Sequence, residues 1–171
     1  LGLNQQGNYI SSPTQVPGTT WRSIDTAGAY HSTIATKTDG TLWMWGGSAH
    51  GQTGQNDQDV HRSSPTQIPG TNWATGVTSG YTVTATKADG SLWCWGDNGD
   101  GELGQNNTTQ YSSPVQVGSD TTWDHISAAE GSIRATKTDG TLWCWGYNSD
   151  GRLGLNSRTE YSSPIQVPGT D

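Results

Sequence analysis

Short stretches in which hydrophobic and polar side chains alternate recur along the chain, and no segment shows the periodicity of an amphipathic helix. Residues 33–37 alternate in this way, which is typical of a half-buried β-strand. The pair Asp39-Gly40 that follows is a strong signal for a two-residue hairpin turn. Residues 41–45 then supply a second strand, so this part of the chain predicts a β-hairpin.

The same hairpin occurs three times at a spacing of 50 residues. Its pattern Ala-Thr-Lys-x-Asp-Gly-x-Leu-Trp-x-Trp-Gly begins at Ala35, Ala85 and Ala135. A tryptophan precedes each copy, at Trp21, Trp73 and Trp123. The tetrad Pro-x-Gln-Val/Ile begins at Pro13, Pro65, Pro114 and Pro164, and residues 1–19 closely match residues 153–170. We therefore divide the chain into a partial unit, 1–19, and three full units, 20–70, 71–121 and 122–171.

Each full unit predicts four short strands. In the first unit these are residues 21–24, 33–37, 41–45 and the Pro-x-Gln-Val segment, and the first strands of the next units are 73–77 and 123–126. Four strands in a unit of about 40–50 residues are typical of a β-propeller blade, and a ring takes about 4–8 blades. We therefore expect an all-β chain of three antiparallel blades plus one extra strand, its ring completed by oligomerisation or by missing sequence.

Composition agrees with an all-β protein, because the chain has nine Trp, six Tyr and 24 Gly, residue types of strands and turns. The net charge of −7 argues against nucleic acid or an anionic membrane as the partner. No apolar run is long enough for a membrane helix. Cys94 and Cys144 stand at one position of successive units, where Met44 stands in the first, so we expect free buried thiols. No metal-ligand spacing is present, and we expect no metal and no cofactor.

The recurring Trp pairs have two interpretations, a binding surface or the packing of neighbouring blades, and packing is favoured because each unit repeats them. They are Trp43/Trp45, Trp93/Trp95 and Trp143/Trp145. A lysine precedes each hairpin aspartate by two residues, at Lys37, Lys87 and Lys137. A repeated salt link or a solvated edge is the favoured interpretation of these lysines.

The recurring motifs Asp-Gly-Thr-Leu-Trp-x-Trp-Gly, Asn-x-x-Gly-x-Leu-Gly and Ser-Ser-Pro-x-Gln-Val resemble the regulator of chromosome condensation repeat. The resemblance covers nearly the whole chain and implies a β-propeller, which in that family usually has seven blades. The first unit departs from the pattern. Ser48 replaces the loop asparagine of the other units, and Thr53 replaces their leucine. This departure predicts either a looser loop or a site particular to that unit.

Loops that differ between units are the expected place for binding, because the repeated residues build the scaffold. One variable loop joins the first two strands of each unit, and another precedes Ser-Ser-Pro. Aromatic and polar side chains in these loops are typical of binding surfaces. The candidate ligand-binding residues are Tyr30, His31, Tyr81, Glu130, Tyr111 and Tyr161.

Catalysis finds no support in the sequence. The histidines His31, His50, His61 and His125 are not equivalent to one another and belong to no catalytic motif, and no nucleophile elbow or phosphate loop is present. The leading hypothesis is therefore a non-enzymatic module that presents variable loops to a protein or a glycan.

Other hypotheses remain open. One is that the chain is a structural segment of an extracellular or viral fibre. An extracellular or virion-associated location is favoured. Independently of this alternative, we expect the chain to associate with itself or to belong to a longer chain. The family resemblance also implies two further functions. One is nucleotide exchange on a small GTPase, and the other is light sensing through Trp residues, as in a plant relative. The Trp-Arg-His motif of that sensor is absent.

Overall fold

The computed structural model describes residues 2–3, 11–27 and 31–169, which form twelve strands in three four-stranded antiparallel sheets. The first sheet contains β1 (Trp21–Ala27), β2 (Ser32–Lys37), β3 (Leu42–Gly46) and β4 (Arg62–Gln67). The second contains β5 (Trp73–Ser79), β6 (Thr82–Lys87), β7 (Leu92–Gly96) and β8 (Tyr111–Gln116). The third contains β9 (Trp123–Ala129), β10 (Ser132–Lys137), β11 (Leu142–Gly146) and β12 (Tyr161–Gln166).

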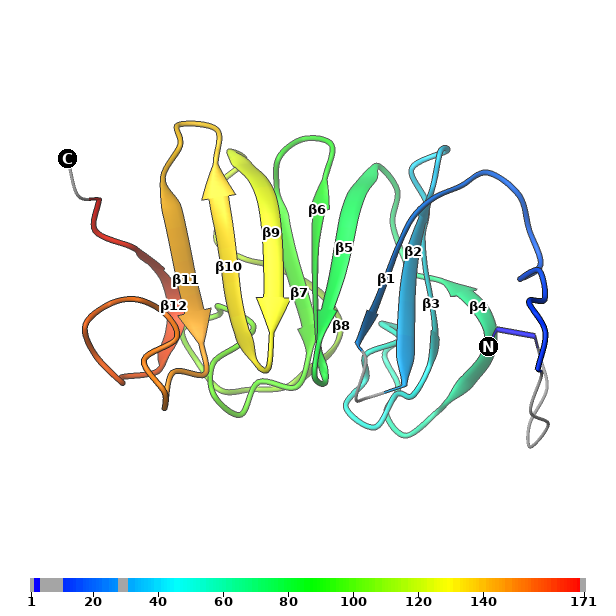
Figure 1. The fold of residues 1–171 in the computed structure, drawn as a ribbon, viewed down its shortest axis with the longest axis horizontal. Coiled ribbons are helices and arrows are strands. Elements are labelled where there is room, and N and C mark those ends of the chain that lie inside the picture. Colours follow the sequence, from blue (N-terminus) through cyan, green and yellow to red (C-terminus); the bar gives the residue numbers. More distant parts are fainter. Residues whose placement is uncertain (1, 4–10, 28–30, 170–171) are drawn as a thin grey trace.

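The sheets stand side by side as successive blades, with the two chain ends at opposite ends of the row (Figure 1). Each sheet is a simple meander in which every strand pairs with the next along the chain. The prediction of all-β blades with four antiparallel strands each is confirmed, and the three blades form an unclosed ring. The described residues contain no helix, and so none that could cross a membrane.

The hairpin turn between the second and third strands is held by side chains as well as by glycine. In the first blade Asp39 Oδ1 accepts hydrogen bonds from the backbone N–H of Thr41 at 3.0 Å and from its hydroxyl at 2.6 Å. Trp43 Nε1 in turn donates to Thr41 Oγ1 at 2.8 Å. The bonds from Thr41 hold the pKa of Asp39 below its usual range. The other blades repeat this arrangement, which therefore fixes the first of the two tryptophans on each third strand.

The hydrophobic core lies between the sheets rather than within one of them. One cluster joins the first and second blades and includes Ile34, Leu42 and Trp73. A second cluster joins the second and third blades and includes Leu92, Trp123 and Trp145. The predicted packing role of Trp95 and Trp145 is confirmed, because both are fully buried and donate from Nε1 to a backbone carbonyl of the preceding blade.

The loop after the third strand is closed differently in the first blade. In the second blade the buried Asn98 binds the carbonyls of Asn107 and Thr109, and it accepts from the backbone of Leu103. The first blade has Ser48 here instead. Ser48 bonds the Thr53 hydroxyl at 2.9 Å, and its backbone donates to His61 Nδ1. The substitutions therefore form a local network of their own.

Two cysteines were predicted to be free and buried, and the structure confirms both. Complete burial raises the pKa of the Cys94 thiol to about 12. These thiols therefore stay protonated and act as apolar core atoms.

The extra strand expected from residues 1–19 is a wrong prediction for the described part of that segment, because residues 11–20 form no strand. Each Pro-x-Gln segment that does form a strand pairs with the preceding strand of its own blade, as Gln67 does with Trp43. No such strand precedes the tetrad at Pro13 among the described residues. Gly2 instead lies against Trp45, as Gly54 lies against Trp95.

Candidate functional site

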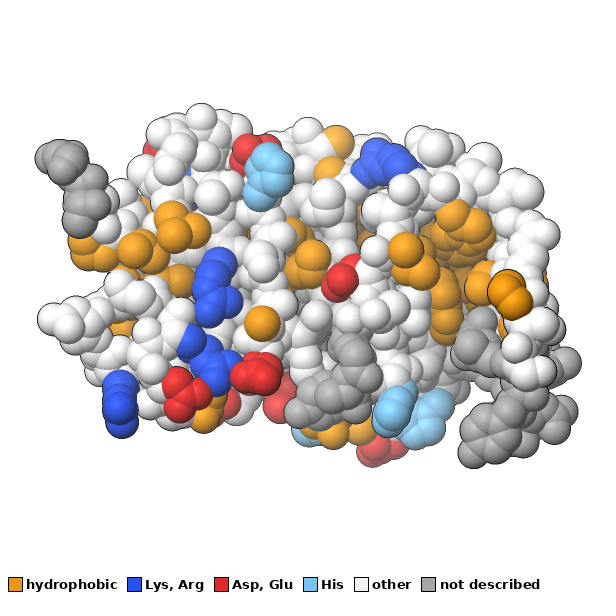
Figure 2. Space-filling model, in the orientation of Figure 1, with side chains coloured by type: hydrophobic (Ala, Val, Ile, Leu, Met, Phe, Trp, Pro, Cys, Tyr) orange, Lys and Arg blue, Asp and Glu red, His pale blue; other side chains and the backbone are white. Residues whose placement is uncertain are grey.

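A cavity of about 240 Å³ lies where the second and third blades meet, at their β5–β6 and β9–β10 turns. Four carboxylates and two tyrosines give it its chemistry: Asp97, Asp100, Glu102, Glu130, Tyr81 and Tyr147. Figure 2 shows charged side chains gathered along the lower edge of the molecule on the side of the third blade. The cavity is thus an acidic hollow at the interface of two blades.

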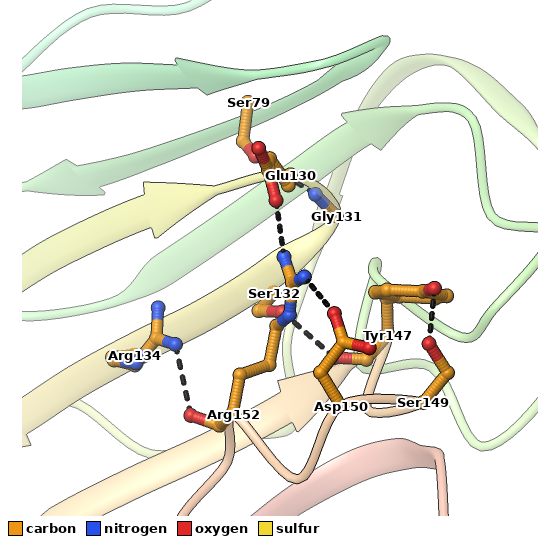
Figure 3. A network of polar contacts seen from close by, with 9 residues as sticks. All are labelled: Ser79, Glu130, Gly131, Ser132, Arg134, Tyr147, Ser149, Asp150 and Arg152. Carbon is orange, nitrogen blue, oxygen red and sulfur yellow. Dashed lines mark hydrogen bonds and ion pairs between the residues drawn. The ribbon is translucent and has the colours of Figure 1, made fainter.

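Tight turns bring residues of both blades to this cavity. Gly80 and Tyr81 form the two-residue turn between β5 and β6. Glu130 and Gly131 form the corresponding turn in the third blade, both with positive φ, at 48° and 75°. Such backbone costs about 1 kcal/mol or more for a residue other than glycine. Gly131 N–H donates to Ser79 Oγ at 3.0 Å, which ties the two turns together (Figure 3).

Glu102 is the deepest carboxylate of the cavity and is only 5% exposed. Its Oε2 accepts the backbone N–H of Asp100 at 2.9 Å. Burial raises the pKa of Glu102, and the neighbouring charges of Asp100 and Asp97 raise it further. None of the ion pairs within the described residues includes Glu102. A cation entering the cavity would therefore stabilise the ionised form of this group.

Arg152 joins the outer part of the site to the loop of the third blade through contacts with Glu130 and Asp150 (Figure 3). Its guanidinium donates to Glu130 at 2.7 Å and to Asp150 at 2.5 Å, and it lies 4.9 Å from the centre of the Tyr147 ring. These carboxylates, Asp150 foremost, raise the pKa of Arg152. Arg152 thus neutralises the outer carboxylate Glu130, whereas Asp100 and Glu102 belong to no ion pair among the described residues.

His50 of the first blade reaches the same region. Its ring stacks on Tyr81 with centroids 4.2 Å apart, and its Nδ1 lies 3.5 Å from Asp97 Oδ1. A protonated His50 would therefore pair with Asp97 at the rim. Tyr81 is fixed by this stacking as well as by its turn.

The structure brings together two of the six residues predicted from the variable loops. Tyr81 and Glu130 both line the acidic cavity. His31 is exposed on the corresponding turn of the first blade, and Tyr30 lies outside the described residues. Tyr111 and Tyr161 belong to β8 and β12 and pack against the second core cluster. The binding role of all six stays a prediction.

The candidate residues predicted from the sequence include none from the glycine-rich loop of the second unit. Asp97, Asp100 and Glu102 lie there, in a segment that carries the repeated scaffold motif. One signal was present: the position of Glu102 holds Gln52 in the first unit and Arg152 in the third. A change of charge at one repeated position is the mark of a residue that the scaffold does not require.

The lysines predicted to form a salt link or a solvated edge instead lie between two indole rings. The Nζ atoms of Lys37, Lys87 and Lys137 stand 4.0–4.8 Å from the ring centroids of two Trp residues in each blade. Lys137 also pairs with Asp120 at 2.5 Å. A salt link is therefore part of the arrangement in the third blade, beside the cation–π contacts.

The acidic cavity is suited to an organic cation rather than to a metal. Within the described ranges, no group of three or more His, Cys, Asp or Glu side chains is placed to hold a metal ion. Carboxylates spread around a cavity flanked by tyrosine rings instead match a lysine or arginine side chain, which brings charge, hydrogen-bond donors and an apolar stem.

Several solved structures and a sequence relative resemble this chain. Human WBSCR16 superposes with a TM-score of 0.84 at 22% identity, over 98% of this chain and 45% of its own. Prp20p of Saccharomyces cerevisiae, whose structure was reported with its binding properties to Gsp1p and histones, gives 0.78 at 17% identity, over 88% and 39%. The yeast RCC1 (Prp20) bound to Kap60 gives 0.77 at 16% identity, over 88% and 37%.

In sequence, Protein pim1 of Schizosaccharomyces pombe is 33% identical over 67 residues, which are 38% of this chain and 12% of that protein. The chain thus spans less than half the length of these relatives. The family model described as regulator of chromosome condensation (RCC1) repeat matches residues 39–86, 89–132 and 139–171, and a second model of the same description matches residues 22–52. The chain therefore belongs to the regulator of chromosome condensation (RCC1) repeat family.

Proposed function

We propose that this chain is a non-catalytic protein-binding module whose acidic cavity takes a basic segment of a partner protein. The observation that carries the proposal is the buried Glu102, which shares the cavity with Asp97 and Asp100 and has no cationic partner among the described ion pairs. The similarity to propellers reported with protein partners supports a protein over a glycan.

The size and the walls of the cavity favour a single long cationic side chain. A volume of about 240 Å³ is below the usual range of about 300–1,000 Å³ for small-molecule pockets. Tyr81 and Tyr147 offer ring faces for a cation–π contact, while the carboxylates accept hydrogen bonds. The net charge of −7 would speed the encounter with a basic partner.

Titration with a short basic peptide tests this proposal. The probe is a peptide with the sequence Arg-Lys-Arg flanked by glycines. Its binding is measured by calorimetry and by the shifts of the NMR signals of Tyr81 and Gly131. Asp97→Asn with Asp100→Asn should weaken binding about tenfold or more, since two charge-assisted contacts are lost. Wild-type binding should also weaken as salt rises from about 0.05 to about 0.3 M.

Glu160→Gln with Asp59→Asn is the matched control, because together they also remove two carboxylates, at exposed positions outside the cavity. It should bind the peptide as the wild type does. Equal losses in the control and the cavity variant would show only a general effect of net charge and would refute a specific site.

A further inference from the structure

The first-strand tryptophan of each blade has an unused hydrogen-bond donor. The Nε1 atoms of Trp21, Trp73 and Trp123 are buried and have no hydrogen-bond partner within the described part of the chain. Trp73 is 2% exposed and Trp123 is 5% exposed. We therefore compare which segment of the chain lies over the indole in each blade.

In the first two blades a Pro-Gly segment of the chain itself lies over this indole. The segments are Val-Pro-Gly-Thr at 16–19 and Ile-Pro-Gly-Thr at 68–71. A Cβ built on Gly18 would come within 3.3 Å of Trp21, and one built on Gly70 would come within 3.6 Å of Trp73 Nε1. Both glycines also have positive φ, at 111° and 98°. The backbone of each Pro-Gly segment thus follows the edge of the indole.

The third blade has a different segment at this position. Its segment, Val-Gly-Ser-Asp-Thr-Thr at 117–122, has no proline and is one residue longer than Ile-Pro-Gly-Thr-Asn at 68–72. Apart from its two chain neighbours, no described residue has an atom within 4 Å of a Cβ built on Gly118. Asp120 instead turns toward Lys137 and pairs with it at 2.5 Å. Lys137 holds the pKa of Asp120 below its usual range.

A pocket of about 480 Å³ opens beside this segment, within the usual size range of ligand pockets. Its walls combine the rings of Trp123 and Trp143 with the polar side chains of Asn106, Ser119 and Ser163. The two rings meet edge to face with centroids 6.1 Å apart. Because Lys137 and Asp120 form an ion pair, the pocket presents little net charge.

We propose that this pocket binds a proline-containing extended segment of a partner protein, in the manner of the Pro-Gly segments that cover Trp21 and Trp73. Grooves lined by aromatic rings bind proline-rich segments because such segments are already extended and lose little entropy. The backbone carbonyls of the segment would accept hydrogen bonds from the pocket's polar side chains. This site is separate from the acidic cavity and needs no basic residue in its ligand.

The chain's own covering segment is the probe that tests the proposal. The peptide acetyl-Gln-Ile-Pro-Gly-Thr-Asn-amide, residues 67–72, is titrated into the protein while the indole N–H signals are followed by NMR. The signals of Trp123 and Trp143 should shift and saturate, while those of Trp73 and Trp93 should not. Proline to alanine in the peptide should weaken binding by about threefold or more, because the free peptide becomes more flexible.

Two variants close the pocket. The first replaces residues 117–122 by Ile-Pro-Gly-Thr-Asn, and it should weaken peptide binding about tenfold or more. The second is Ser119→Phe at an exposed position that lines the pocket, which remains informative if the first does not fold. The Asp97→Asn, Asp100→Asn variant should bind this peptide as the wild type does.

An absence of shifts at Trp123 and Trp143 up to about 10 mM peptide would overturn the proposal, because a Kd above that value corresponds to less than about 3 kcal/mol of binding free energy. Unchanged binding by a folded variant with the closed pocket would also overturn it. If the wild-type protein bound this peptide but did not bind the basic peptide, that result would instead contradict the proposed function of the acidic cavity.

Discussion

At the scale of single residues, Glu102 shows how one repeated position is altered for binding at a cost to stability. The first unit has Gln52 at this position, and that side chain is only 1% exposed. Glu102 is similarly buried but ionisable, and its pKa is raised above the ordinary 4.5. A raised carboxyl pKa means that the fold favours the protonated form, so stability is lost as pH rises from about 4.5 through the folded pKa.

Glu102→Gln should therefore raise the free energy of unfolding at neutral pH and change it little below about pH 4, where the carboxyl is already protonated. Urea unfolding at both pH values measures the difference. The same variant should lose affinity for the basic peptide. A stability gain that is equal at both pH values would contradict the role of ionisation.

At the scale of strands, neighbouring sheets pack a large side chain against a small one. Gly76 on β5 faces the first blade, where its Cβ position lies 2.7 Å from Ile34 Cδ1. The third blade has Ile126 in the place of Gly76, and the second blade has Thr84 in the place of Ile34. The large residue thus changes sides from one interface to the next.

Gly76→Ile should destabilise the protein by about 1–3 kcal/mol, because it overfills the interface. Adding Ile34→Thr, which reproduces the Thr84 and Ile126 pair, should recover part of that loss. Thermal unfolding of both single variants and of the double variant gives the coupling. If the loss of stability in the double variant equals the sum of the losses in the two single variants, the two side chains do not fill a common space.

The strands were largely predictable because their signals are local, whereas the sites were not. Alternation and the Asp39-Gly40 turn act within a few residues, and the predicted hairpins are present. The first strand runs beyond the predicted residue 24 to Ala27, since its pairing continues to Ser32. The strand predicted near Pro13 is absent from the described residues because a strand needs a pairing partner, and the local sequence does not reveal whether one is present. The acidic cavity depends on loops of two blades, whose meeting only the packed structure shows.

At the scale of the whole molecule, three equivalent leucines show where the row of blades is open. Leu42 and Leu92 are fully buried, because a following blade covers each of them. Leu142 is 40% exposed at the free face of the third blade, and Ile24 is 68% exposed at the free face of the first. An open apolar face of this kind favours association.

Leu92→Ala should therefore destabilise the isolated chain by about 2–5 kcal/mol, whereas Leu142→Ala should cost less than about 1 kcal/mol, since little burial is lost there. Unfolding measured across a range of protein concentrations separates the open row from a completed ring. If other copies cover the third blade, the cost of Leu142→Ala should rise toward that of Leu92→Ala as concentration increases, because association stabilises the covered state. A cost that stays small and independent of concentration would show that copies of this chain do not complete the ring through that face.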